Sequence, residues 1–450
     1  MSVHTRSCLS ACSLGMLLLG VYGGAGAAAD PEKEAMKAEM RELKNRLEEL
    51  EERLKGEEQL KEKEEAEPPA QAASQEAEPP AQAASLPEWL NSIELHSFLS
   101  IGYVYNFNNP DSDINTQRFF DWRHNAFRVD DFQFSLLRAA KDPGSVGFRF
   151  DLDVGANIPP VIHSLGLFDN DVNSVTGNVD NLTYIDVRQA FVSYNAPLGN
   201  GLTVDFGKFI THFGLEVIEG WPGFNDNYSR SYDFAFAIPF THTGIRASYP
   251  ISDQWSAMAM VVNGWDQVDD INSMKGFGGQ IGFFPMEDMS FYFNYLGSPE
   301  QPDNDSDWRH LFGLTWVVKP LPTALPDFTL SGTYDYGTEL DTQWQAVEGV
   351  LRYDFTPWFY LALRGEWMDD EDGVRIIPCL PGTGCLGFPP GYSGQSVWAI
   401  TVTPTFKIGE HIVLRPEFRY DQSNEDVFEE EGGGFEDNQT TLGVNAIYSF

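Results

Sequence analysis

Basic residues are scarce in this sequence: 29 Lys and Arg stand against 67 Asp and Glu, a formal net charge of −38 over 450 residues. This balance excludes nucleic acid as a partner, because neutralising phosphates requires clustered Lys and Arg. Beyond residue 22 the sequence also lacks long apolar runs, and its mean hydropathy is −0.30. A multi-span helical membrane protein, which needs about 20 consecutive apolar residues per span, is therefore excluded.

The first 29 residues have the layout of a secretory signal. Arg6 provides a positive start, Leu14–Val21 is a short apolar run, and small residues surround Ala27 and Ala29. This layout predicts a signal peptide over residues 1–29, cleaved near one of these two alanines.

Cysteine is nearly absent. Of the four cysteines, Cys8 and Cys12 would leave with the signal peptide, so only Cys379 and Cys385 remain, at the ends of a short loop that contains Pro and Gly. An exported chain meets an oxidising compartment, so this pair predicts a disulfide. Two thiols without a nearby His do not make a metal site, and no metal or cofactor is expected.

Residues 30–64 predict a periplasmic coiled-coil stalk of about three heptads. Its apolar positions are spaced alternately four and three apart: Met36, Met40, Leu43, Leu47, Leu50 and Leu54. The alternative is a solvated charged helix without a partner. The stretch Glu65–Ser74, with paired prolines and Ala and Gln, then recurs as Glu76–Ser85. This repeat predicts an extended linker over residues 65–93.

From residue 94 onward, apolar and polar side chains alternate with a period of two. In residues 146–154, Val, Phe and Leu share one face of the expected strand, and Gly, Arg and Asp share the other. About 16 such segments follow one another. They begin near residues 95, 127, 146, 184, 202, 241, 254, 277, 289, 308, 327, 343, 358, 396, 411 and 440.

This alternation predicts an all-β fold: an outer-membrane, transmembrane antiparallel β-barrel of about 16 strands over residues 94–450, with 18 strands as the open alternative. Short turns alternate with long loops, as periplasmic and extracellular connections would, and the chain ends in a strand at Phe450. Tryptophans near strand ends predict interfacial girdles: Trp255, Trp265, Trp308, Trp316, Trp344, Trp358 and Trp367. A secreted soluble β-sandwich also alternates, but charged pairs on the polar face favour the barrel.

Two sets of residues are candidates for lining the barrel. Charged side chains on the polar faces are expected to face the lumen: Arg149, Asp151, Asp153, Arg364, Glu366, Arg415, Glu417 and Arg419. The loop within residues 206–240 is long and aromatic, so we expect it to fold inward instead of standing in water. The constriction candidates there are Lys208, Glu216, Glu219 and Arg230. The alternative is that this loop only packs over the barrel mouth.

Residues 205–263 resemble the OmpL-like β-barrel porin-2 family of outer-membrane porins, and the similarity extends over residues 95–450. The matching residues are Gly207-Lys208, Thr211, Gly214-Leu215-Glu216, Ser229-Arg230-Ser231-Tyr232, Pro239, His242-Thr243-Gly244 and Asn263-Gly264-Trp265. The resemblance implies passive transport of small hydrophilic solutes or ions across the outer membrane. The stalk, linker and barrel are also similar in layout to phosphate-selective porins, which implies a homotrimer, but Lys and Arg are sparse on the inward faces.

Charge and motifs refine this expectation. Residues 1–93 contribute −8 of the net charge, which leaves −30 for residues 94–450. An acidic mouth concentrates cations, so we expect a mild cation preference. His212 and His242 lie near Ser229 and Ser231 in sequence, but neither Gly-x-Ser-x-Gly nor His-Glu-x-x-His occurs, so no catalytic residues and no enzyme are expected. The alternative function is a structural or partner-binding barrel, tethered by the stalk, with a plugged lumen.

Overall fold

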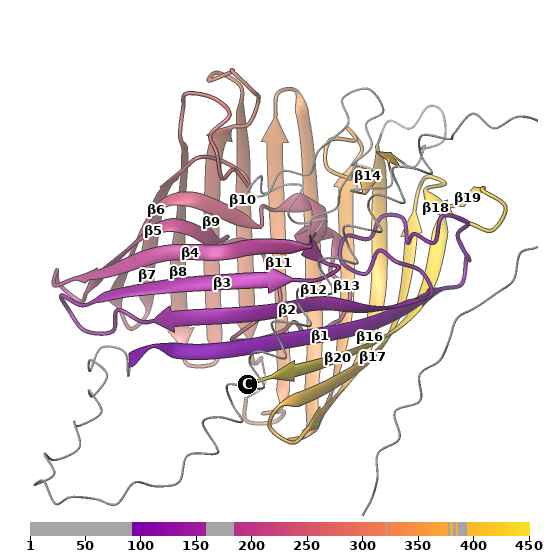
Figure 1. Ribbon diagram of the computed structural model, residues 1–450, viewed down its shortest axis with the longest axis horizontal. Coiled ribbons are helices and arrows are strands. Elements are labelled where there is room, and N and C mark those ends of the chain that lie inside the picture. Colours follow the sequence, from indigo (N-terminus) through magenta and orange to yellow (C-terminus); the bar gives the residue numbers. More distant parts are fainter. Residues whose placement is uncertain (1–91, 159–183, 321, 377–378, 381–383, 386–393) are drawn as a thin grey trace, which may run out of the picture. The chain divides into compact units, whose positions relative to one another are not determined.

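The structure is a computed structural model of the whole chain, and it describes residues 92–158, 184–320, 322–376, 379–380, 384–385 and 394–450. Within these residues, sixteen strands form one closed antiparallel barrel (Figure 1). The predicted all-β barrel and its strand number are therefore confirmed. The signal peptide, the coiled-coil stalk and nearly all of the linker fall within residues 1–91, outside the described residues.

The barrel strands are β1 (Glu94–Asn106), β2 (Ala126–Arg138), β3 (Val146–Val154), β4 (Ile185–Ala196), β5 (Leu202–Ile210), β6 (Thr241–Ser252), β7 (Trp255–Val262), β8 (Gly276–Met286), β9 (Met289–Pro299), β10 (Trp308–Val318), β11 (Phe328–Glu339), β12 (Thr342–Thr356), β13 (Phe359–Asp370), β16 (Gln395–Ile408), β17 (Ile412–Ser423) and β20 (Asn438–Ser449). Each strand pairs with the next in this order, and β20 pairs with β1 to close the barrel. Figure 1 shows the indigo β1 beside the yellow β20.

Three short units are not part of the barrel wall: one π-helix and two sheets of two strands each. The π-helix η2 (Asp233–Ala237) lies between β5 and β6, and β18 (Phe428–Glu429) pairs with β19 (Phe435–Glu436). In the third, β14 (Cys379–Leu380) pairs with β15 (Gly384–Cys385), and Cys379 stands opposite Cys385 in the backbone register. The side chains of these two cysteines lie outside the described part, so the disulfide stays a prediction.

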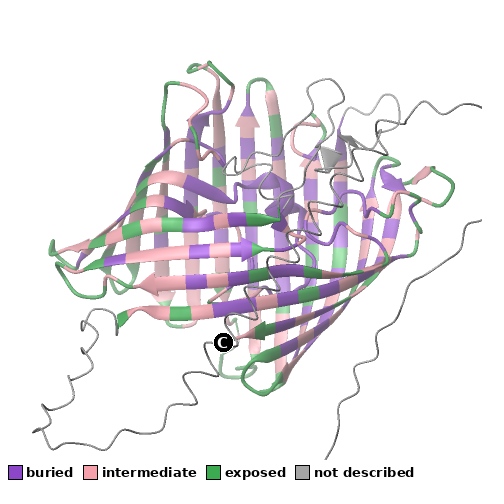
Figure 2. Cartoon of the chain, in the orientation of Figure 1, coloured by how far each residue is buried: buried purple, intermediate pink, exposed green. Residues whose placement is uncertain are grey.

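Buried and more exposed positions alternate along the strands (Figure 2), and the exposed face is mainly apolar and the buried face mainly polar. On β16, Thr401, Thr403 and Thr405 are buried, whereas the intervening positions are more exposed, and Trp398 and Ile400 stand outward. This arrangement is typical of a barrel whose apolar side chains face lipid and whose polar side chains face the interior. Among the described residues, no helix has the length and hydropathy of a membrane span.

Two β-bulges turn additional polar side chains to the buried face. The pairing of β1 with β2 shifts between Ser100 and Ile101, which leaves Asp130 as an extra residue on β2. The pairing of β3 with β4 shifts in the same way at Arg188. Both side chains are buried. A bulge resets the alternation by one position, so a strict period of two cannot predict these residues.

Candidate functional site

Residues 211–240, here called the β5–β6 segment, are held by carboxylates on the polar face of the barrel. Glu417 accepts hydrogen bonds from the backbone amides of Tyr228 and Ser229 at 2.6 and 2.9 Å. Glu366 accepts one from the amide of Tyr232 at 2.6 Å. Buried amides need such partners, so these contacts fix the segment against β13 and β17.

Glu216 and Glu219 of the segment pair with arginines of the barrel. Arg364 Nη1 lies 2.8 Å from Glu216 Oε1, and Arg415 Nη1 lies 2.7 Å from Glu219 Oε1. Arg230, within the segment, is 3.4 Å from Glu219. Burial raises the pKa of Glu219, but the charges of Arg230 and Arg415 outweigh it, so this pKa lies below its usual value. Glu219 is therefore a buried anion balanced by two cations.

Further ion pairs extend this network along β17. Arg419 lies 2.7 Å from Asp421 and 3.3 Å from Glu366. Arg118, in the connection between β1 and β2, reaches Asp421 at 2.5 Å. All four side chains are almost completely buried, and buried charges persist only where they are paired. The network thus joins a second connection to the barrel wall.

A second network lies on β2, β3 and β4. Arg149 Nε is 2.8 Å from Asp151 Oδ2, and Arg149 Nη2 donates to the carbonyl of Trp221 at 2.7 Å. Asp153 forms an ion pair with Arg188, and Arg188 Nη1 also donates to the carbonyl of Glu219 at 2.6 Å. These arginines hold the other side of the β5–β6 segment.

The four constriction candidates do not all lie in one place. Glu216, Glu219 and Arg230 lie in the segment and share the network just described. Lys208 lies on β5, where its Nζ is 3.2 Å from Asp186 Oδ1 and donates to the carbonyl of Val187 at 2.7 Å. The structure therefore brings three of the four together and places Lys208 beside β4.

Several charged residues of these networks are missing from the sequence-based candidates. Asp421 follows Arg419 by two positions, so the alternation that selected Arg419 could have found it. Arg188 is a bulge residue, which the alternation misassigns. Arg118 lies in a connection, where no periodic signal exists.

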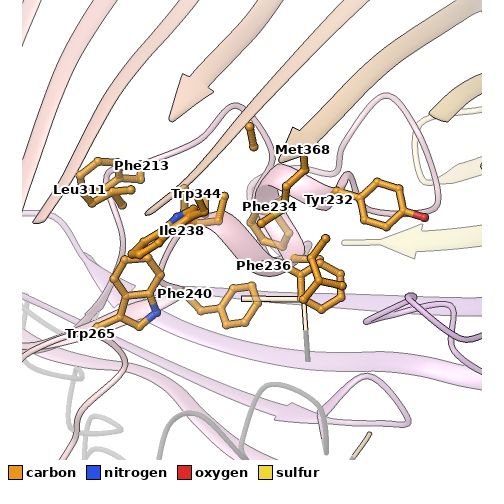
Figure 3. Packing of buried hydrophobic residues seen from close by; sticks show 14 of the residues in the cluster. Phe213, Tyr232, Phe234, Phe236, Ile238, Phe240, Trp265, Leu311, Trp344 and Met368 are labelled. Carbon is orange, nitrogen blue, oxygen red and sulfur yellow. The ribbon is translucent and has the colours of Figure 1, made fainter. Parts of the chain in front are cut away.

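The segment also has an apolar half, built around η2. Phe234 and Phe236 belong to one buried cluster with Leu311 of β10, Trp344 of β12 and Met368 of β13 (Figure 3). The indole Nε1 of Trp344 donates to the carbonyl of Ala237 at 3.0 Å. Side chains of three strands thus share one buried cluster with η2.

This cluster corrects the girdle expectation for two tryptophans. Trp344 is 1 % exposed and Trp265 is 5 % exposed, and their rings meet edge to face at 6.1 Å. Both belong to the buried cluster. Trp255 and Trp358 are instead exposed, in keeping with a girdle. A tryptophan near a strand end can face either side of the wall, and the sequence position alone does not decide which.

A cavity of about 370 Å³ lies between the segment and strands β3, β4, β11 and β12. Its apolar lining includes Leu215, Ile218, Trp221 and Phe224 of the segment. Its charged lining consists of Arg149, Arg188, Glu216, Asp226 and Glu348.

The residues considered for catalysis bond to different partners. His242 contacts Thr211 Oγ1 at 3.1 Å through Nε2 and the carbonyl of Gly264 at 3.0 Å through Nδ1. Ser231 Oγ donates to Glu348 Oε2 at 2.9 Å. Among the described residues, no group of three or more His, Cys, Asp or Glu side chains is arranged to hold a metal ion.

Comparison with known proteins points to one family. The model of the family described as "Putative beta-barrel porin-2, OmpL-like" matches residues 92–450. No curated protein sequence matches the chain.

Solved structures that share the fold include those of the following two proteins. The outer membrane channel DcaP of Acinetobacter baumannii is 14 % identical, with a TM-score of 0.50, over 80 % of this chain and 97 % of that one. OprB of Pseudomonas putida is 11 % identical, with a TM-score of 0.50, over 80 % of this chain and 95 % of that one. At these identities the likeness establishes the barrel fold alone.

Proposed function

The chain belongs to the "Putative beta-barrel porin-2, OmpL-like" family, and from this premise we propose that it gives small hydrophilic solutes and ions a passive route through the outer membrane. One observation carries the proposal: a closed barrel whose outer face is apolar and exposed and whose inner face is polar and charged. Such a wall is stable in lipid and offers a wet path through it. No chemical step is involved.

The β5–β6 segment is proposed as the constriction of this path. Its contacts with β3, β4, β13 and β17 support this role, because a segment bound to opposite parts of a barrel wall must cross the interior. Glu216, Glu219 and Arg230 would then set the charge at the narrowest point, with Lys208 at its margin. The eight lumen-facing candidates would line the path or anchor the segment.

A mild cation preference is the second part of the proposal. The net charge of −30 over residues 94–450 supports it, because an acidic vestibule concentrates cations and repels anions. The arginines near the constriction are paired with carboxylates and offer little free positive charge.

The remaining features of the chain belong to its assembly. We propose that residues 1–29 direct export, that residues 30–64 form a periplasmic stalk and residues 65–93 its linker, and that three copies associate in the membrane. Cys379 and Cys385 would close one loop by a disulfide. Lipid is the partner of the outer apolar face.

The test is conductance of the refolded protein in a planar bilayer under a KCl gradient. Discrete steps, with a reversal potential that favours potassium, are the expected result. A reversal potential that favours chloride would contradict the cation preference, and the porin function would stand.

A tethered structural barrel is the second candidate, and the nearly complete burial of η2 and its neighbours supports it. A well-folded barrel without conductance would favour it. Deleting residues 30–85 separates the two: a porin still conducts, with weaker trimers, whereas a tether loses its role.

A further inference from the structure

The cavity beside the β5–β6 segment has an unbalanced charge. Four of its five charged lining residues form an ion pair. Arg149 pairs with Asp151 at 2.8 Å and Arg188 with Asp131 at 2.7 Å. Glu216 pairs with Arg364 at 2.8 Å and Asp226 with Arg352 at 2.9 Å.

Glu348 is the fifth, and among the described residues it forms no ion pair. It is 1 % exposed. Its Oε2 accepts a hydrogen bond from Ser231 Oγ at 2.9 Å, and its Oε1 has no hydrogen-bond partner. An uncompensated buried carboxylate is costly, so this position favours a cation.

Two more carboxylates stand behind Glu348. In the register of β11 and β12, Thr333 lies opposite Glu348, and Asp335 follows two residues later on the same face. Thr333 Oγ1 donates to Asp335 Oδ2 at 2.7 Å. Asp233 of η2 lies beside Asp335, and the two carboxyl groups are within hydrogen-bonding reach of each other. Within the described part of the chain, neither aspartate forms an ion pair.

The basic groups at the cavity are already occupied. Arg149 is used by Asp151 and by the carbonyl of Trp221. Arg188 is used by Asp131 and by the carbonyl of Glu219. The positive charge of each arginine is thus balanced by an aspartate, whereas Glu348 has no ion-pair partner among the described residues.

The uncharged lining is partly apolar, with Gln189, Asn225, Asn227 and Ser331 as its polar members. Leu215, Ile218, Trp221 and Phe224 cover the segment side of the cavity. A volume of about 370 Å³ lies within the range of about 300–1,000 Å³ that is usual for small-ligand sites. An apolar patch beside one acid without an ion pair favours a ligand with an apolar body and a positive charge.

We infer that this cavity is a binding site for small amphipathic cations, with a protonated amine directed at Glu348 and an apolar or aromatic body against Leu215, Trp221 and Phe224. The inference rests on the proposed function, since it names the class of solute that the pore would hold on its way. Aromatic rings add cation–π attraction to the electrostatic term.

The test measures binding directly. Benzylamine, benzoate and benzyl alcohol share a ring and differ in charge, and each is titrated calorimetrically into the full-length protein in detergent micelles. The expected result is benzylamine binding at least about tenfold tighter than the other two, since a charge-assisted hydrogen bond has that magnitude.

Glu348→Gln is the decisive variant. Glutamine keeps an oxygen for Ser231 and removes the charge, so folding should be retained. Benzylamine affinity should fall about tenfold. Glu425→Gln is the matched control, because Glu425 is exposed in the connection between β17 and β20 and the same charge is removed.

Two results would overturn the inference: equal affinity for the three compounds, or unchanged benzylamine affinity in Glu348→Gln. The second is expected if Asp233, Asp335 and Glu348 are kept neutral by bound protons. KCl conductance of the same preparations separates this failure from failure of the porin proposal. Loss of charge-selective binding with intact conductance refutes only the site, and binding without conductance refutes only the open pore.

Discussion

Single buried charges decide how the β5–β6 segment is held. Arg415 and Arg364 are fully buried, and each is neutralised by a glutamate of the segment. The net value of a buried ion pair is small, because desolvation opposes the attraction. Removing one partner is different, since the other charge then stays buried without compensation. The pairs therefore act as fixed attachment points.

Arg415→Gln tests this at Glu219, which would keep only Arg230. We expect the free energy of unfolding to fall by about 3–5 kcal/mol, measured by urea unfolding of the protein in lipid vesicles. In the control Lys319→Gln, at an exposed ion pair with Asp288, the change should stay below about 1 kcal/mol. Equal effects of the two substitutions would contradict the attachment role of Arg415.

Asp266 offers a pH-dependent test. It follows β7, and its Oδ1 accepts from the amides of Phe240 and Thr241 at 2.6 and 2.9 Å. Burial raises its pKa from 3.8 to about 7, although these two amides oppose the shift. Between about pH 4 and pH 7, Asp266 is therefore protonated in the folded state and ionised in the unfolded state. The contribution of Asp266 to the free energy of unfolding is fully present below about pH 4, and it is lost as the pH rises towards 7.

The matching variant is Asp266→Asn, whose amide oxygen can still accept both bonds. Unfolding free energies of the two proteins, measured from pH 4 to 8, should diverge by up to about 1.4 kcal/mol per pH unit within that window. Parallel pH profiles would show that Asp266 does not titrate in this range.

At the scale of elements, the position of η2 depends on how closely the side chains of β11 and β12 pack against each other. Gly337 of β11 lies opposite Trp344 of β12, and the indole occupies the space above the glycine. This position lets Trp344 lie flat against the wall and donate to the carbonyl of Ala237. A side chain at Gly337 would push the indole into η2.

Gly337→Ala should therefore cost about 1–3 kcal/mol of unfolding free energy and change the fluorescence of the buried tryptophans. Gly349→Ala on β12 is the control, because a Cβ there meets open space. Should both alanines be tolerated equally, the close approach of Trp344 would not matter for stability.

At the scale of the whole molecule, the barrel and the β5–β6 segment are separable. The amide of Thr211 donates to the carbonyl of Phe240 at 2.9 Å, so the two ends of the segment already meet. A short turn could replace residues 212–239 without moving β5 or β6. The barrel would keep Arg364, Arg415 and Arg419 but lose the segment's carboxylates.

We expect this replacement to raise single-channel conductance several-fold, since a wider pore conducts more. The cation preference should weaken or reverse, because residues 212–239 carry four acids and one arginine and the freed arginines would face the pore. Bilayer recordings measure both. Unchanged conductance would mean that the segment is not the constriction.

The sequence by itself determined the wall of this protein. Each of the sixteen strands begins within two residues of its expected start, because a membrane barrel needs apolar side chains on every second position of every strand. That requirement is local, so it can be read from a single segment.

Which side chains face the interior, and how they pair there, was decided only by the tertiary structure. Arg188 and Asp130 face inward because bulges shift the register, and Trp344 and Trp265 pack on η2 instead of facing lipid. Glu348 is the charged cavity residue without an ion pair among those described, although the sequence distinguishes it in no way from Glu366. The ion pairs of Arg364 with Glu216 and of Arg415 with Glu219 join residues more than a hundred positions apart. Their partners are fixed by barrel closure and by the path of one connection, which no local pattern encodes.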